Sequence, residues 1–208
     1  RASAEALRMA FEERYGDRFQ VDIVDLWINH TPWPLNQIPK TYRFMVNDTP
    51  RLWKFLYGMG ENPKATEQAM DAVYPWIRGA IARVFLAYNP DLVISVHPLL
   101  QHIPLRVLAQ LKRRIPFVTV VTDLSTIPAS WFNPHVTRCF VASERACQQG
   151  LRRGMDPAQM RSLGLPIRPI FGREKVAKAE LRGKLGMAPD LPAALLVGGG
   201  EGMGPVAE

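Results

Sequence analysis

Cysteine is scarce in this sequence, and its scarcity excludes several kinds of site. Only two of the 208 residues are cysteine, Cys139 and Cys147, and their spacing matches no zinc-binding or redox-active motif. A scaffold held together by several disulfides is excluded, because two thiols can form at most one bridge. We expect both thiols to be reduced and buried in the core.

Long apolar runs and an excess of acidic residues are also missing. No stretch approaches the roughly 20 consecutive apolar residues that a membrane-spanning helix requires, so any membrane association should be peripheral. Asp and Glu number 19 against 26 Lys and Arg, which gives a net charge of +7. This surplus favours an anionic partner, such as nucleic acid, a phosphate-bearing ligand or acidic lipid, although solubility alone also explains charges spread along the chain.

What the sequence does contain is a central unit of two apolar runs separated by a helix-length segment. The runs are residues 91–96 and 117–122, and residues 101–114 between them can form one helix. Such β-branched runs are typical of parallel strands that are buried on both faces and joined by a right-handed crossover. The sequence therefore predicts an α/β fold with a Rossmann-like parallel sheet.

Polar residues follow the two runs, where parallel strands end. The carboxyl ends of parallel strands meet at one edge of the sheet, which is where ligands bind in such folds. We expect a site at this edge. The residues placed there are His97, His102, Asp123, Ser125 and Thr126.

Hydrophobic periodicity predicts further elements on both sides of this unit. Residues 2–15 and 66–88 have helical spacing, and Pro75 should kink the second helix or begin a new segment. Alternation predicts a strand over residues 19–26. The remaining expected elements are a strand at 138–142, a helix from Ser143 to Gly154, a strand with its exit loop at 162–167, a helix at 175–186 and a strand at 193–197.

Residues 30–57 differ in character from the rest of the chain. Three prolines within residues 30–39 exclude a regular element there. Aromatic and basic residues are then mixed through residues 42–57, a composition that suits the headgroup region of a membrane. An amphipathic helical insertion packed on the domain explains the same composition equally well.

The last segment is rich in glycine. Five of the seven residues 198–204 are glycine, and they follow a predicted strand. Backbone N–H groups in such a loop can be aimed at a phosphate, because no Cβ blocks the approach of the ligand. The spacing matches neither the P-loop nor the dinucleotide fingerprint, so the motif indicates a phosphate or diphosphate site, or else a tight turn without a ligand.

Candidates for acid–base chemistry are few. His97 and His102 could act as general bases, but a histidine at a strand end is more often a hydrogen-bonded structural residue. Asp123 could bind a ligand or cap the turn that follows it, and Asp25 is similarly ambiguous. The residues form no Ser-His-Asp triad and have no metal-ligand spacing.

Several segments together resemble the monogalactosyldiacylglycerol synthases of plants and algae. The most specific are His30-Thr31-Pro32-Trp33-Pro34 and Gly198-Gly199-Gly200-Glu201-Gly202-Met203-Gly204-Pro205. The segments 95–99, 122–126 and 164–169 match as well, and the resemblance extends from the first residue to the last.

The resemblance implies the N-terminal half of a GT-B glycosyltransferase, in which two Rossmann-like domains face a cleft. Residues 1–170 would form the acceptor- and membrane-binding domain, residues 171–189 a linker, and residues 190–208 the start of the donor domain. The UDP diphosphate would lie against the glycine-rich loop. The loop residues concerned are Gly198, Gly199, Gly200, Glu201 and Gly202.

The resemblance also implies an activity, namely inverting transfer of galactose from UDP-galactose to the free hydroxyl of diacylglycerol. It implies peripheral association with the chloroplast envelope and anionic lipid, such as phosphatidylglycerol, as a further partner. It implies no metal and no other cofactor. The family's catalytic base is a histidine that ends a Gly-Gly-Gly-His turn directly before the position of Arg1, so residues 1–208 are expected to be inactive alone. Contacts with acceptor and lipid would involve Trp33, Pro34, His97 and Trp131.

Trp131 and Pro34 follow strand ends in segments predicted to be irregular. Because functional residues are concentrated in such loops, Trp131→Ala and Pro34→Ala are expected to impair turnover more than folding.

Two other functions fit parts of the sequence. A related diacylglycerol glucosyltransferase would share the acceptor half, because the sugar is read largely by donor-domain residues outside 1–208. A non-catalytic nucleotide- or nucleic-acid-binding α/β protein would use the basic charge, although the basic residues do not cluster on one helix and no RNA-binding aromatic motif is present.

Overall fold

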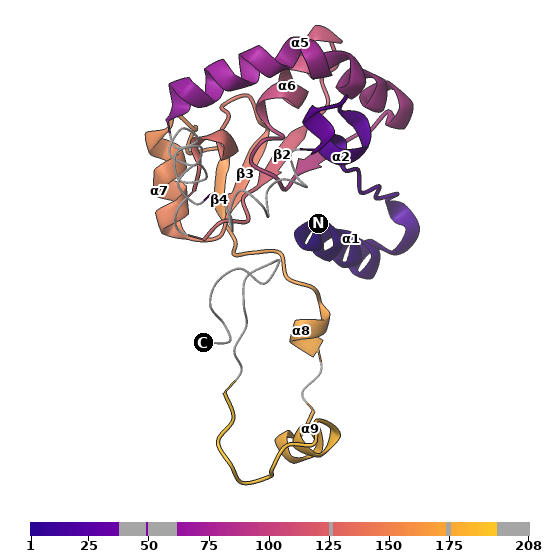
Figure 1. Cartoon of the computed structure of the whole chain (residues 1–208), viewed down its shortest axis with the longest axis vertical. Coiled ribbons are helices and arrows are strands. Elements are labelled where there is room, and N and C mark those ends of the chain that lie inside the picture. The colour runs from indigo at the N-terminus through magenta and orange to yellow at the C-terminus, as the bar shows by residue number, and fades with distance from the viewer. Residues whose placement is uncertain (38–48, 50–61, 125–126, 174–175, 195–208) are drawn as a thin grey trace.

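The centre of the molecule is a sheet of four parallel strands (Figure 1). A computed structural model describes residues 1–37, 49, 62–124, 127–173 and 176–194. The strands lie side by side in chain order, and each pairs in parallel with the next. They are β1 (Val93–Ser95), β2 (Phe117–Val120), β3 (Arg138–Val141) and β4 (Met160–Ser162). The predicted α/β fold with a parallel, Rossmann-like sheet is confirmed.

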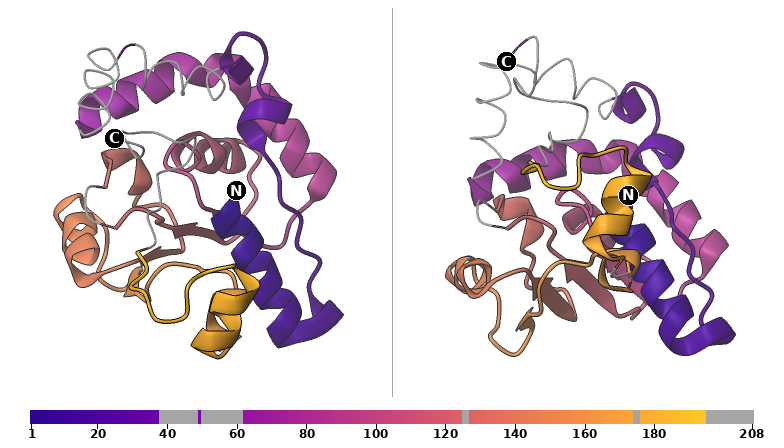
Figure 2. Two further views of the ribbon diagram at one scale, coloured as in Figure 1. Left: turned by 60° about the horizontal axis from the view of Figure 1, so that its bottom comes forward. Right: turned by 90° about the horizontal axis from the view of Figure 1, so that it is seen from below.

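Two helices cover one face of this sheet in successive layers. α6 (His102–Gln110) connects β1 to β2, and α5 (Pro63–Tyr88) packs on α6 (Figure 2). Apolar side chains from both helices and from the strands form one core. Its buried members include Ile77, Ile81 and Phe85 of α5, Ile103 and Val107 of α6, and Phe117 and Val141 of the sheet.

The long helix α5 confirms the prediction for residues 66–88. Asn62 is the N-cap of this helix, and its side-chain oxygen accepts hydrogen bonds from N–H groups of the first turn. It continues through Pro75 as one element and is visibly bent (Figure 2). A proline without an N–H group explains a bend in a helix of this length.

The N-terminal part departs from the prediction. Helix α1 (Ala2–Tyr15) forms as expected and is followed by the short 3-10 helix η1 (Gly16–Arg18). The strand predicted over residues 19–26 is wrong, because the described sheet does not include these residues and α2 (Leu26–His30) begins within them. Residues 19–25 pair with no strand that the structure describes, and Asp25 determines where α2 begins. Its carboxylate caps α2 by accepting hydrogen bonds from the N–H groups of Trp27 (3.1 Å) and Ile28 (2.9 Å).

The remaining elements follow the predicted order. The connection from β2 to β3 contains the 3-10 helix η3 (Ala129–Trp131), whereas α7 (Glu144–Arg152), capped by Ser143, connects β3 to β4. The predicted helices and strands from residue 138 to residue 186 are present, although the helices are shorter and β4 lies slightly before its expected position. The other elements are η2 (Leu35–Gln37), α8 (Ile170–Arg173) and α9 (Lys178–Lys184).

Several sequence predictions fall outside the described residues. These are the strand at 193–197 beyond its first two positions, the glycine-rich loop, nearly all of the aromatic–basic stretch 42–57, and Ser125 with Thr126. Among the helices that the structure describes, none is long and apolar enough to cross a membrane.

Candidate functional site

Charged and polar side chains gather where β1 and β2 end, as the sequence predicts. His97 lies two residues beyond β1, and Asp123 lies three residues beyond β2. Both Asp123 and Asp25, the cap of α2, are close enough to His97 to act on its charge. The first residue of the chain, Arg1, which precedes α1, also lies within electrostatic range of this ring. Strand ends and two N-terminal helices therefore build one cluster, which we call the strand-end site.

His97 is held by hydrogen bonds on its turn. The Leu99 N–H group donates to His97 Nδ1 over 3.3 Å, so the neutral ring carries its proton on Nε2. The residue as a whole is exposed, yet the surrounding protein desolvates the ring enough to lower its pKa from the ordinary 6.5. The carboxylate of Asp25 opposes this shift, and Asp123 opposes it more weakly. A mainly neutral imidazole can accept a proton near neutral pH.

A buried glutamine fixes the turn that carries His97. Gln101 is wholly buried, and its Nε2 donates to the His97 carbonyl over 2.7 Å. Its Oε1 accepts a hydrogen bond from the Thr119 hydroxyl of β2 over 3.3 Å. The turn after β1 is thereby tied to the neighbouring strand. Gln101 was not among the site residues predicted from the sequence, because a polar residue gives no sign of its burial in an isolated sequence.

Trp131 lies in the core rather than on the surface. Its side chain is 1% exposed, and its indole Nε1 donates a hydrogen bond of 2.7 Å to Asp123 Oδ2. The expectation that Trp131→Ala affects turnover more than folding is revised, because removing so large a buried side chain leaves a cavity. The indole cannot reach lipid in this structure, whereas its N–H group does reach the strand-end site.

Trp33 and Pro34 are both exposed, on the loop between α2 and η2. Trp33 is 78% exposed, which leaves an aromatic ring in solvent. The loop follows α2 directly, and α2 is capped by the same Asp25 that acts on His97. The structure thus connects the loop to the strand-end site through one short helix.

His102 belongs to a second cluster rather than to the strand-end site. Its Nδ1 lies 3.0 Å from Asn133 Nδ2, and its environment includes Glu67 of α5, the Ser130 backbone and His135. Burial lowers the pKa of His102, and the Glu67 carboxylate opposes the shift. These partners favour the structural interpretation that the sequence left open for this residue.

The two cysteines are free thiols. Cys139 is wholly buried in β3, and burial raises its pKa to about 12, which removes any thiolate at neutral pH. Cys147 on α7 is half-buried, and its pKa is also raised, by burial and by Glu144. Within the described part of the chain, no group of His, Cys, Asp and Glu side chains could hold a metal ion.

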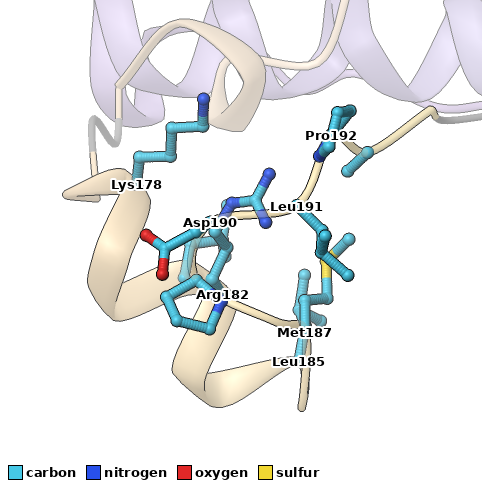
Figure 3. Close-up of a pocket in the computed structure, with 10 residues that line it drawn as sticks. Lys178, Arg182, Leu185, Met187, Asp190, Leu191 and Pro192 are labelled. Atoms are coloured by element: carbon cyan, nitrogen blue, oxygen red, sulfur yellow. The ribbon is translucent and has the colours of Figure 1, made fainter.

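A hollow of about 570 Å³ lies elsewhere, between α9 and the segment after it (Figure 3). Lys178 and Arg182 reach over it from the helix, and Asp190, Leu191 and Pro192 close the other side. The Arg182 guanidinium is buried and donates to the Ala188 carbonyl, which folds the segment onto α9. None of the strand-end residues lines this hollow, so the candidate site stays at the strand ends.

The sheet and its strand-end site define a Rossmann-like α/β domain, an architecture consistent with one half of a glycosyltransferase. A family model described as "Monogalactosyldiacylglycerol (MGDG) synthase" matches residues 1–167. The chain therefore belongs to the monogalactosyldiacylglycerol synthase family.

Curated relatives from plants support this assignment. The chloroplastic monogalactosyldiacylglycerol synthase of Spinacia oleracea is 49% identical over 99% of this chain. Synthase 1 of Arabidopsis thaliana is 48% identical over 99%, and the probable synthase 2 of Oryza sativa subsp. japonica is 48% identical over all of it. The chain covers 40% of the spinach protein, 39% of the Arabidopsis protein and 45% of the rice protein, so it spans less than half of each relative.

Proposed function

We propose that this chain forms the acceptor-binding half of an enzyme that transfers galactose from UDP-galactose to diacylglycerol. The observation that carries the proposal is the strand-end site, in which a mainly neutral histidine and two carboxylates meet at the carboxyl edge of a parallel sheet. The transfer of galactose to diacylglycerol is inferred from the family to which the chain belongs. Galactose is preferred to glucose because the relatives are named as galactolipid synthases.

The reaction needs a base that removes the proton of the acceptor hydroxyl as the sugar is transferred. We place the base at a histidine directly before Arg1, as the family resemblance implies. The nearness of Arg1 to His97, which lies within electrostatic range of it, supports this placement, because a residue preceding Arg1 would then lie close to the strand-end site. His97, Trp33 and Pro34 are then proposed to contact the acceptor lipid.

The departing UDP carries negative charge that hydrogen-bond donors have to stabilise. The loop residues Gly198, Gly199, Gly200, Glu201 and Gly202 are proposed to supply backbone N–H groups to the diphosphate. This loop would begin the donor domain at residues 190–208, with residues 171–189 as the linker and residues 1–170 as the acceptor domain.

Diacylglycerol lies in a bilayer, so an enzyme acting on it has to work at the membrane surface. We propose peripheral association with the chloroplast envelope and binding of anionic lipid such as phosphatidylglycerol. The exposed ring of Trp33 and the net charge of +7 support this. The relatives are named as chloroplastic, which agrees with the compartment.

A transfer assay tests the proposal. The protein encoded by the complete reading frame that contains residues 1–208 would be incubated with labelled UDP-galactose, or with labelled UDP-glucose, and diacylglycerol vesicles. We expect labelled galactolipid from the first donor and little product from the second. Equal use of UDP-glucose would favour the diacylglycerol glucosyltransferase, and no lipid product from either donor would contradict the proposal.

A further inference from the structure

The imidazole of His97 presents a hydrogen-bond donor at the strand-end site. The Leu99 N–H group donates to His97 Nδ1 over 3.3 Å, so Nδ1 supplies the lone pair and Nε2 carries the proton of the neutral ring. Among the residues that the structure describes, none accepts a hydrogen bond from Nε2. His97 is exposed, so this N–H group is available to a ligand.

The turn that carries this donor is fixed through the backbone carbonyl of His97. This carbonyl accepts hydrogen bonds from Gln101 Nε2 over 2.7 Å, from the Leu100 N–H group over 3.1 Å and from the Ser95 hydroxyl over 3.4 Å. The shortest of them comes from Gln101, which is wholly buried. A donor held inside the core thus determines where the backbone of His97 lies, and with it the place of the ring.

Gln101 is itself held by its neighbours. Its Oε1 accepts a hydrogen bond from the Thr119 hydroxyl over 3.3 Å, and Thr119 is wholly buried in β2. Its backbone carbonyl accepts the Leu105 N–H group of α6 over 3.1 Å. Because the amide oxygen is used by Thr119, the NH2 group of the same amide is left to face the His97 carbonyl.

The charges around His97 restrict what its N–H group can bind. Asp25 and Asp123 are both close enough to act on the charge of the ring, and both are carboxylates. A phosphate or diphosphate bound to His97 would bring like charges together, which is unfavourable. A neutral oxygen meets no such repulsion. The ligand atom that fits His97 is therefore a neutral hydrogen-bond acceptor.

We propose that the Nε2–H group of His97 donates a hydrogen bond to an ester carbonyl oxygen of the acceptor lipid, and that Gln101 is a positioning residue that holds His97 for this contact. The inference rests on the proposed function, because it takes diacylglycerol to be bound at the strand-end site. The hydroxyl proton of the lipid still goes to the base, since the ester groups are separate acceptors on the same molecule.

The inference predicts a preference that one pair of acceptors can measure. A dialkylglycerol has the same free hydroxyl as diacylglycerol but has ether oxygens in place of the ester carbonyls. Both lipids, with matched chains, would be presented at the same mole fraction in the same vesicles to the protein of the complete reading frame. We expect kcat/KM to be about three- to tenfold higher for the diacyl lipid, the usual contribution of one hydrogen bond.

His97→Leu removes the donor and should abolish this preference, while the KM for UDP-galactose stays the same. His97→Gln should keep most of the preference, because its NH2 group can donate from a similar position. His135→Leu is the matched control. His135 is also exposed but precedes β3, at the opposite edge of the sheet, so its loss should leave the preference unchanged.

Gln101→Met tests the positioning role, because it keeps the length of the side chain and removes both of its hydrogen bonds. We expect the preference for the diacyl lipid to decrease. Thr119→Val breaks the same bridge through a smaller change, so the test does not depend on Gln101→Met remaining folded, and Thr119→Ser should restore the preference because it keeps the hydroxyl. A preference that survives in Thr119→Val and in Gln101→Met would overturn the positioning role of Gln101.

The outcomes separate this inference from the proposed function. If the wild-type protein makes galactolipid but uses both lipids equally well, or if His97→Leu keeps the preference, the inference is overturned and the proposed function stands. A raised KM for UDP-galactose in His97→Leu, with the lipid preference unchanged, would place the sugar donor against His97 and would also overturn it. If the wild-type protein transfers no sugar to lipid, the proposed function itself fails.

Discussion

His102 shows how one residue can make stability depend on pH. The Asn133 side chain donates to His102 Nδ1 over 3.0 Å, and it is held in that orientation because Asn133 Oδ1 accepts the N–H group of His135. A proton added to Nδ1 would face an NH2 group that cannot accept it. Burial and this arrangement both favour the neutral ring, which agrees with the lowered pKa of His102.

The sign of the pH effect follows from this lowering. The pKa of His102 lies below 6.5 in the folded protein, so the unfolded chain binds the proton more readily. The contribution to stability is therefore complete above pH 6.5 and is lost as the pH falls below it. We expect the free energy of unfolding, measured with urea at pH 7.5 and 5.5, to decrease toward acid, by at most about 1.4 kcal/mol per pH unit for each such group.

Substitution isolates the residue responsible. His102→Gln should flatten the pH dependence between 7.5 and 5.5. His97→Gln should flatten it separately, because the pKa of His97 is lowered as well. A wild-type protein that becomes more stable toward pH 5.5, or a His102→Gln variant with an unchanged slope, would contradict this explanation.

At the scale of elements, the periodicity of hydrophobic residues predicted most of the helices and strands. The apolar runs of β1 and β2 and the helical stripe of α5 gave the right element in the right order, because their burial follows directly from their pattern. The strand prediction for residues 19–26 was wrong because a strand also needs a neighbour to pair with, and none of the described strands pairs with these residues. Asp25 ends the segment by capping α2. A carboxylate that caps the next residues starts a helix even where the pattern favours a strand.

The candidate site was predictable only in part, for a related reason. His97 and Asp123 were found because they follow apolar runs, and strand ends meet in a parallel sheet. The contact of Trp131 with Asp123 and the bridge made by Gln101 join residues 8 and 18 positions apart through a buried core. Such contacts depend on how the core packs, and a linear pattern does not encode them.

Helix α7 offers a test of element packing at Gly150. A Cβ there would lie 2.6 Å from Met160 Cε and 2.8 Å from Phe132 Cε1. The terminal methyl group of Met160 can move aside, but the Phe132 ring is buried and has little room to shift. We expect Gly150→Ala to destabilise the protein by about 1–3 kcal/mol in urea unfolding, the usual cost of overpacking.

Gly79 on α5 is the matched control for this prediction. A Cβ there would meet only Arg83 Nη1, at 4.0 Å. Gly79→Ala should therefore stabilise the protein by up to about 1 kcal/mol through helix propensity alone. Equal effects of the two substitutions would show that close packing of α7 against Phe132 does not limit the side chain at position 150.

At the scale of the whole molecule, the net charge of +7 predicts how the chain meets a membrane. Each basic side chain near an anionic surface contributes about 1 kcal/mol, so a few acting together give measurable adsorption. We expect residues 1–208 to sediment with phosphatidylglycerol vesicles at low salt and to be released near 1 M salt, where the Debye length is about 3 Å. Vesicles of neutral phosphatidylcholine are the control, and no binding to anionic vesicles at low salt would contradict peripheral association through charge.

The order of the strands has a consequence for how the protein is made. Each described strand after β1 pairs with the strand that precedes it in the chain, and none has to insert between two strands already paired. A chain leaving the ribosome can therefore extend the sheet one strand at a time, from β1 to β4, with each addition closing a short connection. During synthesis the open edge on the growing side belongs to the newest strand, and it is this edge that a chaperone would have to shield.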